Sequence, residues 1–175
     1  EHVGEVAHVI GRAQRLDGPE GPGYRGYVSA SYRTKLQHAT IIGGAMPSRV
    51  QRILDERGAL VFPGVYDTLS AKIAEQAGFP LAFVSGYAVS ATLIGEPDIG
   101  LLTQTEIIDR ARRICRTVTI PIIVDADTGY GTALNVVRTV DELIDAGAAG
   151  CVLEDQVWPK TCGHMPGKRG IDRTD

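Results

Sequence analysis

Two acidic residues close together in segment 122–131 are the first candidates for chemistry. Asp125 and Asp127 end an apolar run that begins at Ile122, and one alanine separates them. Side chains two residues apart on a strand share a face, so both carboxylates project together from the end of this strand. Two carboxylates so close repel each other unless something neutralises them. A hard divalent cation does so, and Mg²⁺ usually binds one or two carboxylates and keeps several waters.

Further acidic residues lie at equivalent places along the chain. Glu154 and Asp155 follow another apolar run, and Asp98 lies in the segment G-E-P-D-I-G, residues 95–100. The alternative interpretation is that each strand-end aspartate only caps the helix that follows it. Acidic pairs at the ends of two successive strands favour a metal site instead. Its predicted ligands are Asp98, Asp125, Asp127 and Glu154.

A loop rich in basic residues follows the last apolar run. Four basic side chains flank Cys162 in segment 158–169: Lys160, His164, Lys168 and Arg169. Positive charge lowers the pKa of a thiol and suits it for proton transfer, so Cys162 is a candidate catalytic group. The alternatives are an inert cysteine or half of a zinc site. Zinc would need further ligands at fixed spacing, and neither Cys115 nor Cys151 forms a C-x-x-C pair.

A small polar segment, Ser85-Gly86-Tyr87, follows the apolar run that begins at Leu81. A hydroxyl and a bare glycine at a strand end can offer side-chain and backbone donors to a carboxylate. An ordinary glycine turn would show the same pattern, and the segment alone does not separate the two interpretations.

The elements that must position these residues are short apolar strands alternating with amphipathic helices. The pattern predicts strands over 59–63, 81–85, 120–125 and 150–154. It predicts helices over 48–57 and about 67–77, 104–116 and 133–146. Thr103 and Glu106 have the spacing of a capping box, and Gly78 and Gly147 lie where helices should end.

Near-continuous apolar strands that alternate with helices indicate a parallel sheet buried on both faces. A doubly wound open sheet would favour a G-x-G-x-x-G fingerprint, which F-P-G-V-Y-D at 62–67 lacks. Polar residues at the carboxyl ends of successive strands are typical of a (β/α)₈ TIM barrel. We therefore predict an α/β fold in which residues 46–175 form the N-terminal half of such a barrel, about four βα units. Residues 1–45 are expected to be an irregular extension, and both edge strands are expected to lack a partner.

Composition excludes several classes of protein. Eighteen basic and 21 acidic residues among 175 give a net charge of −3, without the basic footprint that nucleic-acid binding needs. No apolar run approaches the ~20 residues that span a bilayer. Three scattered cysteines and the lack of a signal-like N-terminus indicate a reducing compartment. The predicted location is the cytoplasm, with the mitochondrial matrix as the alternative in a eukaryote.

Taken in order, these motifs resemble the isocitrate lyase / phosphoenolpyruvate mutase superfamily over residues 47–169. The resemblance lies in P-G-V-Y-D (63–67), S-G-Y (85–87), G-E-P-D-I-G (95–100), V-D-A-D-T-G-Y-G (124–131), E-D-Q (154–156) and K-T-C-G-H (160–164). It implies a (β/α)₈ barrel with Mg²⁺ or Mn²⁺. It also implies that Asp125 binds the metal directly, while Asp98, Asp127 and Glu154 hold its water shell.

The K-x-C-G-H loop resembles the 2-methylisocitrate lyase-like branch, in which the cysteine shuttles a proton on a mobile loop. The resemblance implies a catalytic role for Cys162, with Lys160 and His164 beside it. It implies substrate binding by Ser85, Gly86, Tyr87, Gly163 and His164. Thr161 departs from the family, because that place is usually held by Lys or Arg.

The function that the resemblance implies is Mg²⁺-dependent cleavage of a C–C bond in a small 2-hydroxy dicarboxylate or tricarboxylate, by a retro-aldol step. The alternatives are an oxaloacetate decarboxylase or hydrolase, a phosphonopyruvate-processing enzyme of the same fold, and a non-catalytic half-barrel. The resemblance further implies a homo-oligomer, a tetramer in full-length relatives. Since the second half-barrel would supply further substrate contacts, we expect a chain that ends at Asp175 to be weakly active by itself or inactive.

Overall fold

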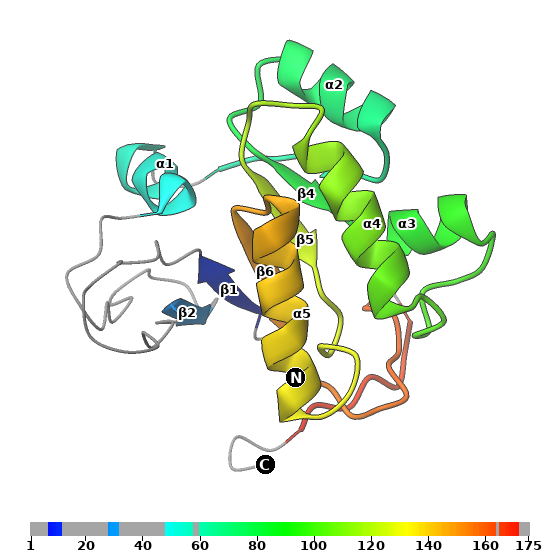
Figure 1. The fold of residues 1–175 in the computed structure, drawn as a ribbon. Helices are drawn as coiled ribbons and strands as arrows, with labels where there is room; N and C mark the ends of the chain where they lie inside the picture. The colour runs from blue at the N-terminus through cyan, green and yellow to red at the C-terminus, as the bar shows by residue number, and fades with distance from the viewer. Residues whose placement is uncertain (1–6, 12–27, 32–47, 58–59, 164, 172–175) are drawn as a thin grey trace.

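The computed structural model describes residues 7–11, 28–31, 48–57, 60–163 and 165–171. Within them, one sheet has the strand order β2-β1-β6-β5-β4-β3 (Figure 1). Its parallel part consists of β3 (Gly64–Val65), β4 (Ala82–Val84), β5 (Ile122–Asp125) and β6 (Gly150–Glu154). The predicted α/β architecture with a buried parallel sheet is confirmed.

The order of these four strands decides between the two architectures that the sequence left open. Each strand pairs in parallel with the strand that precedes or follows it along the chain, without a reversal of order. A doubly wound sheet reverses its order at a switch point, whereas a barrel adds each strand beside the last. The parallel part of the sheet is therefore an arc of four strands of the (β/α)₈ type, and helices follow the first three of them in the described residues.

Five helices lie in the described residues. They are α1 (Arg49–Arg57), α2 (Thr68–Gln76), α3 (Gly86–Leu93), α4 (Gln104–Cys115) and α5 (Ala133–Ala146). Four of them confirm the predicted helices. The sequence pattern did not predict α3, which begins directly after β4 with Ser85 as its N-cap.

Local capping explains where several helices begin and end. The side chain of Asp67 accepts from the Ser70 N–H at 2.7 Å at the start of α2. The predicted capping box of α4 is present, since the Thr103 N–H donates to Glu106 at 2.8 Å. Gly147 follows α5 in the left-handed conformation, with φ of 96°, as expected of a helix-ending glycine.

The two faces of the sheet carry separate apolar clusters because side chains alternate along each strand. Val84 and Val124 belong to the larger cluster, which residues of α2, α4 and α5 complete. Phe83 and Ile123 point to the opposite face, where they pack with Val50 of α1. The helix predicted over 48–57 thus covers the second face, and the strands are buried on both sides.

Strand β3 is shorter than the predicted strand over 59–63 and begins later. The C=O of Pro63 accepts from the Phe83 N–H at 3.0 Å, and the C=O of Val65 accepts from the Ser85 N–H at 3.1 Å. Pro63 has no N–H of its own to continue the ladder in the other direction. Pairing with β4 therefore starts at the proline and covers Gly64–Val65.

Two short strands lie in the segment for which the sequence predicted no regular structure. β1 (Ala7–Gly11) pairs antiparallel with β6 on one side and with β2 (Val28–Ser31) on the other. The prediction that both outer strands of the parallel sheet lack a neighbour is wrong for β6. An exposed edge of N–H and C=O groups accepts any extended segment that can reach it, and that segment need not show a sustained apolar period.

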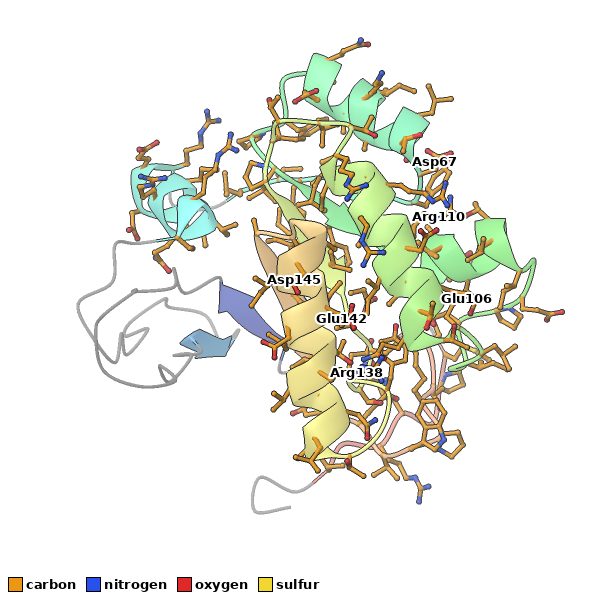
Figure 2. All side chains as sticks on the ribbon, in the orientation of Figure 1. Asp67, Glu106, Arg110, Arg138, Glu142 and Asp145 are labelled. Carbon is orange, nitrogen blue, oxygen red and sulfur yellow. The ribbon has the colours of Figure 1, made fainter. Side chains whose placement is uncertain are left out.

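Charged side chains occupy the outer surfaces of the helices, as the residues labelled in Figure 2 show. Glu142 of α5 lies 3.8 Å from Arg138 of the same helix and 4.0 Å from Arg112 of α4. Such exposed ion pairs contribute little, so we interpret this surface as a solvated face. None of the helices in the described residues is long and apolar enough to cross a membrane.

Candidate active site

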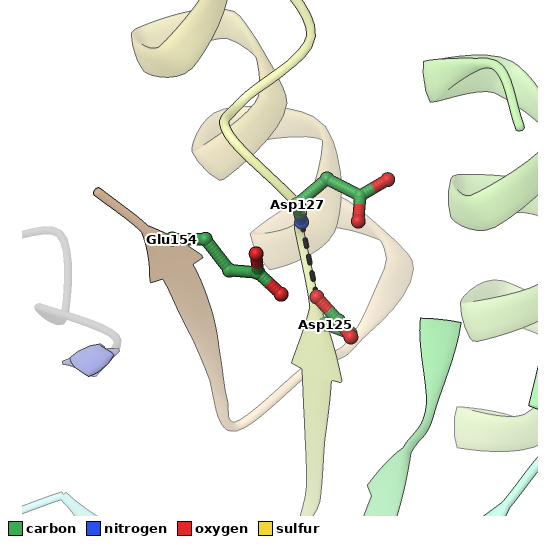
Figure 3. A group of neighbouring side chains, drawn as sticks. All are labelled: Asp125, Asp127 and Glu154. Atoms are coloured by element: carbon green, nitrogen blue, oxygen red, sulfur yellow. Dashed lines mark hydrogen bonds between the residues drawn. The ribbon is translucent and has the colours of Figure 1, made fainter. Parts of the chain in front are cut away.

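Three carboxylates converge at the carboxyl ends of two adjacent strands (Figure 3). Asp125 ends β5, Asp127 follows it, and Glu154 ends β6. Each of the three offers an oxygen, and these oxygens lie within 4.8 Å of one another. We call these three residues the acidic cluster. The structure thus brings together three of the four residues that the sequence predicted as metal ligands.

Asp125 is held in place by two backbone N–H groups, one on each oxygen. Its Oδ1 accepts from the Asp127 N–H at 3.1 Å, and its Oδ2 accepts from the Gly86 N–H at 3.2 Å. A Cβ on residue 86 would lie only 2.8 Å from Oδ2, so glycine is needed there for close approach. Gly86, predicted to bind substrate, donates its N–H to a residue of the acidic cluster.

The turn after β5 has an unusual backbone that directs Asp127. Asp127 and Tyr130 have φ values of 48° and 63°, which non-glycine residues rarely adopt. Thr139 of α5 is fully buried and donates from its Oγ1 to the C=O of Gly129 at 3.0 Å. Such strain persists where the surrounding structure over-determines it, and it is common at functional sites.

Lys160 connects the basic loop to the acidic cluster. Its ammonium group contacts Asp127 and lies 2.8 Å from Asp98 Oδ1, and its side chain is fully buried. Asp98 therefore reaches the edge of the site, as predicted, but its partner is Lys160. In the described residues, the group of carboxylates that could hold one metal ion consists of Asp125, Asp127 and Glu154 and does not include Asp98.

Gln156 is a site residue that the sequence reasoning did not single out. Its amide group donates to Glu154, and its Oε1 accepts from the Thr161 N–H at 2.8 Å. Lys168 adds a positive charge 3.5 Å from the same glutamate. Gln156 belongs to the E-D-Q motif, but its amide is uncharged, whereas Glu154 and Asp155 were identified by their negative charge. Its position two residues after Glu154 was the available signal.

The electrostatics of the cluster follow from burial and from the closeness of like charges. Burial raises the pKa of Asp125 to about 7, and the negative charge of Asp127 adds to the rise. Burial likewise raises the pKa of Asp127. Burial alone would lower the pKa of Lys160, but the charges of Asp127 and Asp125 and the bonds to Asp127 and Asp98 raise it. The site thus has more carboxyl groups (Asp98, Asp125, Asp127 and Glu154) than ammonium groups beside them (Lys160 and Lys168).

Tyr130 is a second residue that the sequence reasoning left out. Burial raises its pKa well above the usual range, and the charges of Asp127 and Asp125 contribute next. It packs at the edge of the larger apolar cluster. Its phenol therefore stays protonated, and a hydrogen bond to Asp127 adds to the rise.

The remaining predicted residues have different degrees of exposure. Cys162 is 6% exposed and follows Lys160 in the same loop, whereas Gly163 is exposed. His164 lies outside the described residues. Ser85 caps α3, with its Oγ accepting from the Ala88 N–H at 3.4 Å, and Tyr87 is half exposed in the first turn.

The chemistry of this donor set fits a divalent cation. Three clustered carboxylates, two of which have raised pKa values, would be stabilised by a hard positive ion with oxygen ligands. Asp125, Asp127 and Glu154 are the residues that would hold it. The cluster lies where barrels of this type build their active sites.

Comparison with known families decides the classification. The phosphoenolpyruvate phosphomutase family matches residues 51–172, which is more than half of the chain. The chain belongs to the phosphoenolpyruvate mutase / isocitrate lyase superfamily. The predicted membership is thereby confirmed.

Relatives in this superfamily have names that cover more than one chemistry. The chloroplastic carboxyvinyl-carboxyphosphonate phosphorylmutase of Arabidopsis thaliana is 51% identical over 146 residues, covering 82% of this chain and 43% of its own. The 2,3-dimethylmalate lyase of Eubacterium barkeri is 43% identical over 128 residues, covering 73% of this chain and 44% of its own. The chain therefore spans less than half the length of these superfamily members.

Solved structures from the superfamily support the same fold. Oxaloacetate acetylhydrolase in complex with 3,3-difluorooxalacetate matches with a TM-score of 0.68 and 37% identity, over 72% of this chain and 43% of its own. Phosphonopyruvate hydrolase in complex with oxalate and Mg²⁺ matches with a TM-score of 0.60 and 37% identity, over 68% of this chain and 42% of its own.

Proposed function

We propose that the whole protein to which this chain belongs is a Mg²⁺-dependent lyase that cleaves a C–C bond. The substrate is a small 2-hydroxy dicarboxylate or tricarboxylate of the isocitrate, 2-methylisocitrate or 2,3-dimethylmalate type. The products are a 2-oxo acid and a second acid, which is a monocarboxylate from a dicarboxylate substrate and a dicarboxylate from a tricarboxylate. The observation that carries this proposal is the loop that brings a buried cysteine, Cys162, next to a lysine bound to the acidic cluster. A solved relative in complex with oxalate and Mg²⁺ supports the choice of cation.

Each part of the site has a role in this reaction. Asp125, Asp127 and Glu154 would hold the cation, which would supply Lewis-acid chemistry to the substrate when bound. The first turn of α3, residues 85–87, lies next to Asp125 because the Gly86 N–H donates to it. The start of α3 carries the positive end of the helix dipole, so this turn suits a substrate carboxylate.

The bond-breaking step is redox neutral and needs two proton transfers. A base takes the proton of the 2-hydroxyl group, the C–C bond breaks, and its electron pair stays on the departing fragment. The hydroxyl carbon becomes the carbonyl of the 2-oxo acid, and the thiol of Cys162 gives a proton to the departing carbon. Burial of Cys162 excludes water from this transfer.

Relatives' names include a phosphorylmutase, so phosphorus chemistry is the main rival within the superfamily. Cys162 favours C–C cleavage, because a proton donor to carbon has no part in moving a phosphoryl group. An oxaloacetate decarboxylase would also break a bond to carbon, but its departing fragment can take a proton from water. An oxaloacetate hydrolase differs from the proposed lyase in its substrate. The response of activity to loss of the thiol separates these functions.

A substrate screen with the whole protein tests the proposal. Isocitrate, 2-methylisocitrate, 2,3-dimethylmalate and oxaloacetate are each supplied with Mg²⁺, and release of a 2-oxo acid or of oxalate is followed. We expect turnover of a 2-hydroxy acid, and Cys162→Ser should lower its kcat by at least about 100-fold, as loss of a general acid does. The proposal fails if oxaloacetate alone is consumed, or if the serine variant keeps full activity.

The substrate class and the assembly are proposals of the same kind. We propose a small carboxylic acid as the ligand, with no role for nucleic acid or membrane, and a homo-oligomer as the assembly. Sedimentation of the whole protein tests the assembly, and a monomer at micromolar concentration would contradict it.

A further inference from the structure

Gln156 is a buried amide that lies just beyond the strand carrying Glu154. β6 ends at Glu154, and Gln156, two residues later, is 5% exposed. Its backbone forms an antiparallel bridge with Gly170, and the next residue, Val157, donates its N–H to the C=O of Arg169 at 2.8 Å. The backbone that carries the amide is therefore fixed by pairing with a second segment.

The backbone of Thr161 decides which way this amide faces. An N–H group can only donate, so the amide must present its oxygen to it, and Gln156 Oε1 accepts from the Thr161 N–H at 2.8 Å. The NH₂ group then faces the other way and donates to Glu154 Oε2. A reversed amide would place two donors together and its oxygen against a carboxylate. The observed orientation is the one in which both contacts are attractive.

The Gln156 amide restricts the Glu154 carboxylate. Glu154 reaches from β6 towards Asp125 and Asp127 (Figure 3). In the part of the chain that the structure describes, the donor groups beside its carboxylate are the Gln156 amide and the Lys168 ammonium group 3.5 Å away, and both lie at Oε2. This arrangement leaves Oε1 for an ion in the acidic cluster.

Glu154 needs such a partner more than Asp125 does. Asp125 is short and accepts a backbone N–H on each oxygen. A glutamate side chain has one more rotatable bond, and ordering it costs side-chain entropy. An amide carries no net charge, so Gln156 can orient the carboxylate without cancelling the charge that attracts a cation.

We propose that Gln156 is a positioning residue that orients Glu154, so that Oε1 of this glutamate faces a divalent cation shared with Asp125 and Asp127. The proposal rests on the proposed function only in taking a divalent cation as the ligand of the acidic cluster. Gln156 acts through Glu154 and not on the cation itself. Loss of a partner that orients a metal-binding side chain typically lowers metal affinity by about 10- to 100-fold.

Titration with Mn²⁺ tests this role without any substrate, with free Mn²⁺ measured by electron paramagnetic resonance. Gln156→Met keeps the length of the side chain and removes its hydrogen bonds, so its Mn²⁺ affinity should fall at least about tenfold. Gln51→Met is the matched control. The Gln51 amide also donates to a carboxylate, that of Asp55 at 2.8 Å, but this pair lies on α1, and the Mn²⁺ affinity should not change.

A double-mutant cycle separates a positioning role from a general loss of structure. Glu154→Gln keeps the length of the side chain and removes its charge. In that background Gln156→Met should lower the Mn²⁺ affinity by less than about threefold, because no carboxylate remains to be oriented. A general structural defect would instead lower the affinity by the same factor in both backgrounds.

Gln156→Asn keeps the test decisive if Gln156→Met folds poorly. Its side chain retains the amide but is one methylene shorter, so it cannot bridge the Thr161 N–H and Glu154. The same loss of Mn²⁺ affinity is expected. Chemical denaturation of each variant measures whether it is folded under the conditions of the titration.

Three results would overturn the proposal. They are no Mn²⁺ binding to the unchanged protein, an unchanged affinity in both Gln156 variants, and equal losses with and without the Glu154 carboxylate. None of these results depends on turnover. The predicted Mn²⁺ affinities without lyase activity would contradict the proposed function alone. Lyase activity with normal Mn²⁺ binding by both Gln156 variants would contradict the positioning role alone.

Discussion

At the scale of single residues, Asp125 is the carboxylate on which the site is built. It is the only one of the three with each oxygen bound to a backbone N–H, from Gly86 and from Asp127, among the hydrogen bonds of the described residues. Burial at the end of β5 raises its pKa, and the bond from the Asp127 N–H opposes that rise. Changes that move it or protonate it should therefore act on cation binding before they act on stability.

Cation affinity should depend on pH through this residue. The pKa of Asp125 is raised from 3.8 to about 7, with burial as the main cause, so in the cation-free protein it holds a proton below that pH. Cation binding must displace this proton, so we expect the Mn²⁺ affinity to fall about tenfold per pH unit below pH 7. Titrations at pH 6, 7 and 8 measure it, and an affinity constant across this range would contradict the prediction.

The raised pKa of Asp125 also predicts how its contribution to the free energy of unfolding changes with pH. The folded-state pKa exceeds the unfolded value, so the contribution of Asp125 to stability is fully present below pH 3.8. It is lost as the pH rises through about 7. A bound divalent cation should restore stability at high pH, because it neutralises the ionised carboxylate.

Gly86→Ala should displace Asp125. The new Cβ would lie 2.8 Å from Oδ2 and 3.1 Å from Cγ of Asp125, so the carboxylate must move. We expect about a tenfold loss of Mn²⁺ affinity, equivalent to ~1.4 kcal/mol. Gly64→Ala is the matched control, because its Cβ meets only the Ser85 Cβ at an ordinary 3.6 Å. Equal affinities in the two variants would show that close approach at residue 86 does not matter.

The positions of the acidic residues after successive apolar runs predicted that they lie together, but strand alternation does not place Asp127, which follows β5 in a turn with φ of 48°. The sequence was not enough to predict the partners of Asp98 and Gln156, which are Lys160 and Glu154. Lys160 and Asp127 are 33 positions apart, and nothing in the sequence around either residue indicates that the two side chains are in contact. Asp98 was expected to serve the cation, but burial of a lysine beside it gave it a different partner.

At the scale of elements, α5 holds the turn that follows β5. Thr139 donates to the C=O of Gly129 and of Asn135 and accepts from Gln104 of α4 at 2.6 Å. One hydroxyl group thus joins two helices to the turn that carries Asp127. This hydroxyl is the link between the helical layer and the acidic cluster.

Thr139→Val should break that link at nearly constant volume. We expect a loss of about 1–3 kcal/mol in the free energy of unfolding, because Gly129 and Gln104 lose their partner. Mn²⁺ affinity should also fall, since the turn relaxes. Chemical denaturation and Mn²⁺ titration measure the two effects. Thr92→Val is the control, because the exposed Thr92 hydroxyl bonds only within α3.

A helix was predictable from the sequence where polar and apolar residues alternate at the helical period and a capping residue is present. α4 has both, and its capping box appears where the sequence placed it. α3 escaped prediction because G-Y-A-V-S-A-T-L contains no charged residue, so no polar stripe marks its outer face. Its start depends on Ser85 and on packing beside β5, which the local sequence does not show.

At the scale of the whole molecule, the pairing of β1 with β6 covers one edge of the parallel sheet. No sequence pattern indicated this pairing, because edge pairing uses backbone groups that every residue has. In the described residues the opposite outer strand, β3, pairs with β4 alone. The two edges of the sheet should therefore differ in their tendency to associate.

Val9→Pro should uncover the edge of β6. Val9 pairs with Ala30 on one side and Val152 on the other, and a proline cannot donate to either ladder. We expect more self-association, seen as a concentration-dependent increase in mass by light scattering. Val9→Ala keeps the N–H and should remain like the unchanged protein. Identical masses for both variants would show that β1 does not protect the edge.

The two N–H groups on Asp125 also bear on which ions the site can accept. A carboxylate fixed through both oxygens cannot turn to grip an ion with both of them at once. Ca²⁺ commonly uses such a grip and about six to eight oxygens at longer range, whereas Mg²⁺ takes a compact octahedron with single oxygens. We therefore expect the two N–H groups bound to Asp125 to make the site select Mg²⁺ over the larger Ca²⁺. Mg²⁺ should displace bound Mn²⁺ at concentrations at which Ca²⁺ does not. Equal displacement of Mn²⁺ by both ions would show that the Asp125 carboxylate is free to rotate.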